Sequence, residues 1–258
     1  MSLEPVLELV PAFVLVFFRL AGMMITAPLF GSARVPRRVK MYFALGLAVG
    51  MVPSVQVPVA LPESTWALAG GMAGELLFGL AIGTALNLVF VGAQWAGEII
   101  GQQMGLGLGQ ILDPQHGTSG SVVADMYFLL TFLLFLALQG HHAFLRGVRD
   151  SFDTLPLLSA ALDRGLFDLL VSLLQSSTGL AMQLAAPTLI AMLVTDVVLG
   201  FLGKTMPQIN VMSAGLSLRS LVGMFVLLAG MAFTSDVIAA GFVDSIRQIG
   251  EAWQGVAG

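Results

Sequence analysis

The feature that most constrains this chain is its long apolar runs, the longest of which extends from residue 166 to residue 202 without a strong turn signal. A continuous helix of that length would measure about 55 Å, whereas the hydrocarbon core of a bilayer is about 30 Å thick. The run must therefore tilt, project from the membrane or kink, and Pro187 makes Ala186 the most favourable position for a kink. Such a run indicates a helical membrane protein.

Composition agrees with membrane insertion and excludes other classes. The residues AVILMFWYC make up 57% of the 258 residues, charged residues only 10%, and the mean hydropathy is +0.92. These values fit neither an ordinary soluble domain nor a disordered chain. A net charge of −4, with 11 Lys and Arg, leaves no basic face for nucleic acid. Because the chain has no cysteine, it can form no disulfide and offers no thiolate to a metal.

Six apolar segments predict an all-α, polytopic membrane protein with about six long helices. They cover residues 13–30, 41–57, 66–91, 122–138, 166–202 and 216–242. No cation precedes the first segment, so we expect it to be retained rather than removed as a signal peptide. Pro53 interrupts the second segment, which therefore crosses obliquely or stops short.

Basic residues are concentrated after the first apolar segment. Four of the eleven cations lie within seven positions, at Arg34, Arg37, Arg38 and Lys40. Because short loops rich in Lys and Arg stay in the cytoplasm, this cluster favours a cytoplasmic position for the first loop.

Several ionisable residues lie inside the apolar segments. Arg19 is midway along the first, where an ionised side chain costs about 2.5–3.5 kcal/mol or more, so it must face a partner or a polar cavity. Glu75 and Asp196 are its possible partners, and a structural pair that fixes assembly is favoured over a direct role in transport. Asp125 and Asp236 are similarly placed. Pairing of these charges with other subunits is an equal alternative.

No pattern typical of a catalytic or metal site is recognisable. His141 and His142 are adjacent, so on a helix they point about 100° apart and cannot both ligate one metal ion. The motifs HExxH, GxSxG and GxxxxGK[ST] are absent from the sequence. We therefore predict no enzyme, no metal and no cofactor, with an intramembrane hydrolase as the less favoured alternative.

A glycine-rich segment separates the third and fourth apolar segments. Glycine occupies positions 101, 105, 107 and 109, which is too many for a stable helix, and the intervening residues are too apolar for a solvated loop. Irregular backbone at membrane depth is tolerated only inside protein or beside a water-filled cavity. The residues alone leave two options, a re-entrant or plug-like element and a loop packed on the surface.

An ordered set of short motifs resembles one known family. The motifs are Phe18-Arg19-Leu20-Ala21-Gly22, Val35-Pro36-Arg37-Arg38-Val39-Lys40, Asp113-Pro114, Gly140-His141-His142, Ala185-Ala186-Pro187, Thr195-Asp196 and Pro207-Gln208-Ile209-Asn210-Val211. Together they resemble the FliR family of flagellar and type III secretion export-gate proteins. The resemblance covers nearly the whole chain, and the carboxy-terminal part is also similar to the small partner FliQ.

The resemblance implies an export-gate fold of kinked helical hairpins in a single domain of residues 1–258. Residues 1–165 correspond to a FliP-like half and residues 166–258 to a FliQ-like hairpin. In the family, FliR assembles with several FliP and FliQ subunits around a central passage, with FlhA and FlhB as further components. The implied protein is therefore a multi-pass subunit of the bacterial inner membrane, in contact with lipid at the flagellar basal body. Its implied role is to form part of the passage through which unfolded flagellar proteins are secreted.

The resemblance also implies two groups of site residues. Residues 101–117 correspond to the plug that closes the passage at rest, and the residues expected to seal it are Met104, Gly105, Leu106, Gly107, Leu108, Gly109, Ile111 and Leu112. Family members often carry Phe in this stretch, and this chain has none. At the turn between the last two helices, Gln208 and Asn210 are expected to bridge subunits, although ordinary turn chemistry explains them equally well.

Two alternative functions differ in what is transported. A virulence-type secretion homologue shares the fold and exports other proteins. A self-contained small-solute transporter belongs to another class and would favour an inverted repeat, which the two halves of this sequence do not show.

Overall fold

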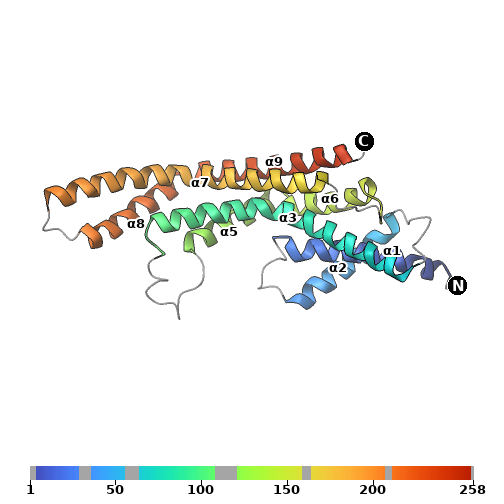
Figure 1. Ribbon diagram of the computed structural model, residues 1–258. Coiled ribbons are helices and arrows are strands. Elements are labelled where there is room, and N and C mark those ends of the chain that lie inside the picture. The colour runs from blue at the N-terminus through green and yellow to red at the C-terminus, as the bar shows by residue number, and fades with distance from the viewer. Residues whose placement is uncertain are drawn as a thin grey trace. The chain divides into compact units, whose positions relative to one another are not determined.

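The computed structural model describes residues 4–28, 36–55, 64–107, 121–158, 164–206 and 211–256 (Figure 1). Every regular element in these ranges is a helix, which confirms the all-α prediction. In chain order the elements are α1 (Glu4–Thr26), α2 (Arg37–Met51), the 3₁₀ turn η1 (Val52–Ser54), α3 (Thr65–Gln103), α5 (Val122–Ala137), α6 (Gly140–Thr154), α7 (Arg164–Thr205), α8 (Val211–Ala229) and α9 (Met231–Val256).

Within the described residues, each predicted apolar segment falls mainly on helical backbone, but two boundaries differ from expectation. The sixth segment is not one helix, because it breaks at Gly230 into α8 and α9, which are bent by 62°. The third continues beyond its expected end, so that Gly92, Gly97 and Gly101 lie within α3. These glycines admit neighbouring chain segments, since a Cβ at Gly97 would overlap the backbone of Ala124. Close packing therefore outweighs the poor helix propensity of glycine here.

Two helices in the described part of the chain are long and apolar enough to cross a membrane. They are α3 and residues 167–205 of α7, and counting the bent pairs α5–α6 (70°) and α8–α9 as single spans raises the number to four. The helix α7 continues through Pro187 without interruption. The structure thus fits a polytopic membrane protein, with fewer full-length spans than apolar segments.

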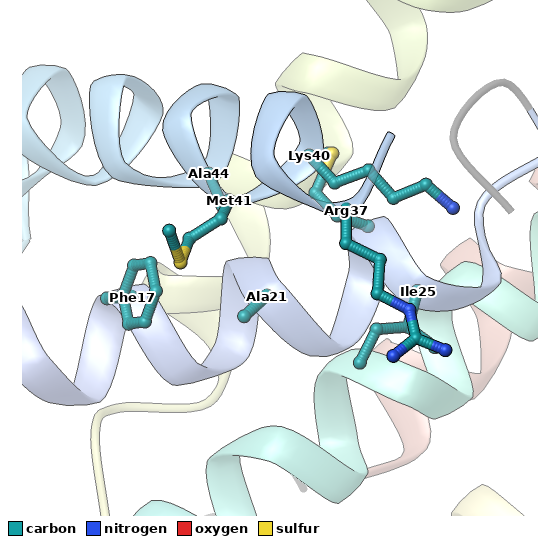
Figure 2. Close-up of a pocket in the computed structure, with 8 residues that line it drawn as sticks. Phe17, Ala21, Ile25, Arg37, Lys40, Met41 and Ala44 are labelled. Atoms are coloured by element: carbon teal, nitrogen blue, oxygen red, sulfur yellow. The ribbon is translucent and has the colours of Figure 1, made fainter. Parts of the chain in front are cut away.

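The chain forms two compact units. The first contains residues 1–88, 139–174 and 245–258, and the second contains residues 89–138 and 175–244. In the first unit α1 and α2 run antiparallel, as the labelled residues of Figure 2 show. A second contact in this unit joins α1 to α3, where Gly22 lies against the α3 backbone and Gly79 lies against the Arg19 carbonyl. Small residues at this crossing let the two backbones touch.

The core of the second unit contains an aromatic cluster. The ring of Phe90 on α3 lies 5.6–5.8 Å, between centroids, from those of Phe128 and Phe135 on α5 and Phe242 on α9. Edge-to-face and tilted pairs at such distances contribute roughly 0.5–1.5 kcal/mol each beyond their burial. The aromatic cluster therefore holds α3, α5 and α9 together.

Candidate functional site

The end of α3 is built as a Schellman motif at the start of the glycine-rich segment. The Gly105 N–H donates to the Gln102 carbonyl at 3.0 Å, and the Leu106 N–H donates to the Gly101 carbonyl at 3.1 Å. Gly105 has a φ of +78°, the left-handed conformation that this motif requires and that glycine adopts without a Cβ clash. The glycine at position 105 is thus the residue that stops the helix.

This helix end is fastened to α8. The Ser220 hydroxyl donates to the Met104 carbonyl at 3.1 Å, which gives one carbonyl at the helix terminus a partner. The Met104 side chain is 1% exposed and fills the space where Gly223 lacks a side chain. Leu106, by contrast, is 42% exposed. The first residue of the expected seal is therefore an anchor, and the exposed apolar surface begins two residues later.

The far end of the same connection is attached to α3 as well. The Ser121 N–H donates to Glu98 Oε1 at 3.3 Å, and the Ser121 hydroxyl donates to the Gly97 carbonyl at 3.4 Å. Ser121 is the N-cap residue of α5, but its hydroxyl donates to Gly97 and makes no capping bond within α5. Glu98 accepts the backbone N–H of this N-cap residue, so that N–H has a partner on α3. Sequence reasoning missed Glu98, although it is the only charged residue between Glu75 and Asp113.

The structure describes half of the expected plug residues. Met104, Gly105, Leu106 and Gly107 form the turn that follows α3. The other four, together with the two amides of the expected inter-helix turn, lie outside the described residues: Leu108, Gly109, Ile111, Leu112, Gln208 and Asn210. Their roles stay predictions.

Two of the charged residues expected inside apolar segments, Arg19 and Glu75, meet in a second cluster, in the first unit. Arg19 Nε donates to Glu75 Oε2 at 2.5 Å, and both side chains are 0% exposed. One terminal guanidinium nitrogen donates to the carbonyls of Ser151 and Leu155 at 3.0 and 3.1 Å, and the other donates to the Leu155 carbonyl at 3.1 Å. Glu75 Oε1 accepts the Leu158 N–H at 3.0 Å. The buried charges are therefore paired and hydrogen-bonded, which is the condition under which burial of an ion pair is tolerated.

Aromatic rings complete the surroundings of Arg19. Its guanidinium carbon lies 4.5 Å from the ring centroid of Phe152 and 5.0 Å from that of Phe78, within the range of cation–π attraction. Leu158 has a φ of +69°, and its side chain occupies the space beside Gly71. The cluster thus joins α1, α3 and α6 with the segment after α6.

The third charged residue expected in this group lies elsewhere. Asp196 on α7 pairs with Arg219 on α8, with 2.6 Å between Arg219 Nη2 and Asp196 Oδ1. The same Asp196 oxygen has no contact that meets hydrogen-bond geometry, so the contact is an ion pair without a well-directed bond. Both side chains are more than one-third exposed, where such pairs contribute about 0–1 kcal/mol. Of its two possible partners, Arg19 therefore pairs with Glu75.

The adjacent histidines form no recognisable metal site. The rings of His141 and His142 lie 4.2 Å apart between centroids at the start of α6. Across the described ranges, no three His, Cys, Asp or Glu side chains gather as a metal ion would require.

Comparison with known proteins gives matches along almost the entire chain. The family model described as bacterial export proteins, family 1, matches residues 10–244. The chain is similar to flagellar biosynthetic protein FliR of Bacillus subtilis, with 30% identity over 241 residues and 92% of each chain covered. It is 31% identical over 236 residues to flagellar biosynthetic protein FliR of Caulobacter vibrioides, covering 91% of this chain and 92% of the relative. Surface presentation of antigens protein SpaR of Shigella flexneri is 28% identical over 214 residues, with 82% of each chain covered.

Proposed function

Because the chain belongs to the FliR family of bacterial export proteins, we propose that it is a core subunit of the flagellar type III protein export gate. In this proposal it joins FliP and FliQ subunits in the bacterial inner membrane, and unfolded flagellar proteins are secreted through the passage that they form. The observation that carries the proposal is the match to flagellar relatives over more than nine-tenths of both chains. Motifs alone would not support a function, but the match to the family model, over residues 10–244, overlaps every described helix.

The subunit is proposed to act without catalysis. Arg19 and Glu75 have each other and nearby backbone groups as partners, so they are occupied in structure rather than poised for proton transfer. Energy for export then has to come from other components, with FlhA and FlhB as the expected neighbours.

The glycine-rich connection is proposed to close the passage at rest. Its anchored start at Met104 and its exposed Leu106 support this assignment, because a seal needs a fixed base and apolar side chains that meet across a constriction. Deleting residues 105–109 removes Gly105, Gly107 and Gly109 together with the apolar side chains of Leu106 and Leu108. We expect the deletion to raise ion leakage of cells that express the whole gate while the complex still assembles. Unchanged leakage with normal assembly would show that this connection is not the plug.

The assembly itself is tested by the mass of the intact complex. The chain is expressed with its genomic neighbours, purified through a tag on the chain itself, and weighed by native mass spectrometry. We expect a hetero-oligomer with multiple copies of two small membrane proteins. A folded monomer or homodimer would contradict the proposal and favour the small-solute transporter.

A second candidate is a secretion system other than the flagellum. The match to SpaR supports it, at lower identity and coverage than the flagellar relatives. Deleting the gene and testing for flagella separates the two, since loss of filaments is expected only for the flagellar subunit.

A further inference from the structure

A pocket between α1 and α2 combines an apolar floor with a basic end (Figure 2). Its volume is about 490 Å³, which is within the range of roughly 300–1,000 Å³ typical of small-molecule sites. The lining residues are Phe17, Ala21, Met24 and Ile25 from α1 and Arg37, Lys40, Met41 and Ala44 from α2. None of them is acidic, and the two cations among them are Arg37 and Lys40.

Polarity changes along the length of the pocket. Figure 2 shows Phe17 and Met41 at one end, and Arg37 and Lys40 at the other, beside Ile25. A small polar anion would leave the apolar end unused, and a hydrocarbon would leave the cations unused. The pocket therefore matches a ligand with an anionic head and an apolar tail.

The start of α2 adds to the attraction for an anion. Pro36, its N-cap residue, offers no side-chain bond, and the first turn contains no acidic residue. Helix N-termini favour negative charge, yet this one carries Arg37 and Arg38. A phosphate at this position would interact favourably with both the helix terminus and the guanidinium of Arg37, which can bind a phosphate through two hydrogen bonds.

Apolar surface continues from the pocket along α2. Met41, Leu45 and Val49 follow one another at four-residue spacing, so they lie on one side of the helix. They are 47%, 37% and 60% exposed. This row leads away from the basic end, because Arg37 is the first residue of α2. A chain too long for the pocket would have an apolar surface to follow.

We propose that this pocket binds an anionic phospholipid of the surrounding membrane. The phosphate lies at Arg37, Lys40 and the start of α2, and an acyl chain lies over Phe17 and Met41 and then along α2. A zwitterionic lipid fits less well, because no lining carboxylate is present to pair with its ammonium group. This lipid site is separate from the proposed export function, since it depends on no passage and no partner subunit.

The proposal is tested with the full-length chain in phosphatidylcholine nanodiscs, with and without phosphatidylglycerol. Native mass spectrometry measures the phosphatidylglycerol that stays bound to the chain after the chain is released from the nanodisc. Basic residues near an anionic membrane surface contribute about 1 kcal/mol each, so we expect binding to weaken roughly 5-fold for Arg37→Gln and about 30-fold when Lys40→Gln is added. Ala21→Leu should also reduce binding, because it fills the pocket and leaves both cations in place.

Matched controls separate this site from general attraction between charges. Arg146→Gln with Arg149→Gln removes the same charge from exposed positions on α6 that do not line the pocket, and should leave binding unchanged. Thermal unfolding of each variant checks that it is folded. The proposal would be overturned if the double variant on α6 lost as much phosphatidylglycerol binding as the double variant in the pocket. It would also be overturned if Arg37→Gln with Lys40→Gln left binding unchanged. Displacement of the lipid by glycerol 3-phosphate at similar concentration would also overturn it, because the occupant would then be a soluble phosphate.

Discussion

Replacing Arg19 with methionine removes the positive charge from a site where neither member of the ion pair touches solvent. Glu75 would then be a buried carboxylate without its cation, and the Leu155 carbonyl would lose both guanidinium donors. Breaking a buried pair by removing one partner typically costs about 3–5 kcal/mol. The Ser151 carbonyl is less affected, because it still accepts the Leu155 N–H of the α6 helix end. We therefore expect the free energy of unfolding to fall by roughly 3–5 kcal/mol.

The complementary variant Glu75→Leu leaves Arg19 with two carbonyl acceptors and two aromatic rings. The loss of unfolding free energy in this variant should therefore be at the lower end of the range, about 3 kcal/mol. In the double variant no unpaired charge remains, and replacing a buried pair by apolar residues is often close to neutral. The costs that persist are those of the Leu155 carbonyl and the Leu158 N–H, about 1–3 kcal/mol each. The double variant should thus be no less stable than Arg19→Met, which corresponds to a coupling energy of about 3 kcal/mol.

Unfolding by SDS of the purified full-length chain in mixed micelles measures these differences, with the three tryptophans as the fluorescence probe. Arg149→Met, at an exposed position on α6, is the control for loss of a cation and should change stability by less than about 0.5 kcal/mol. If the two single losses simply add in the double variant, within about 0.5 kcal/mol, the residues are not coupled and the reasoning fails. If Arg19→Met unfolds like the wild type but abolishes export, its role is functional rather than structural.

Glycine substitutions test the helix stop at Gly105 and the close approach of α1 to α3 at Gly79. Gly105→Ala places a Cβ at φ +78° and should lower stability by about 1–2 kcal/mol, whereas Gly107→Ala, with open space around it, should change stability by less than about 0.5 kcal/mol; equal effects in chemical unfolding would contradict the Schellman assignment. Gly79→Ala would push a methyl group into the Arg19 carbonyl and should cost about 1–3 kcal/mol or more. Its control on the same helix, Gly70→Ala, has no atom within 4 Å and should stabilise by up to about 1 kcal/mol. A harmless Gly79→Ala would mean that α1 and α3 do not need this close contact.

Apolar runs predicted the positions of the helices, because burial of one face or insertion into lipid is encoded locally in the sequence. They did not predict the break between α8 and α9 at Gly230. Gly223 has the same low helix propensity as Gly230, yet it lies inside α8 without interrupting the helix. What differs is the neighbour: the Met104 side chain packs on Gly223. Propensity counts glycine as a cost in a helix, whereas packing between helices turns the missing side chain into an advantage, and only the tertiary structure decides which effect is larger.

The ion pair illustrates a different limit. The energetic cost of an isolated charge in an apolar helix is a property of the residue, so the need of Arg19 for a partner followed from the sequence. The identity of the partner did not follow from the sequence, because Glu75 is 56 residues away from Arg19 and Asp196 satisfied the same requirement. Glu75 is selected by the crossing of α1 and α3, where Gly79 brings the backbones into contact one helical turn from Glu75. The selection therefore depends on small residues that carry no charge.

The same helix α3 also limits how the proposed plug can move. The connection leaves α3 through the Leu106 bond to Gly101 and returns to it through the Ser121 bonds to Glu98 and Gly97. Both attachments lie within about one helical turn of each other, since α-helices have 3.6 residues per turn. A rearrangement between these attachments breaks neither of them, so opening of the proposed plug does not require α3 or α5 to shift. In this proposal the hydrogen bonds of Leu106 and Ser121 to α3 stay in place when the plug opens.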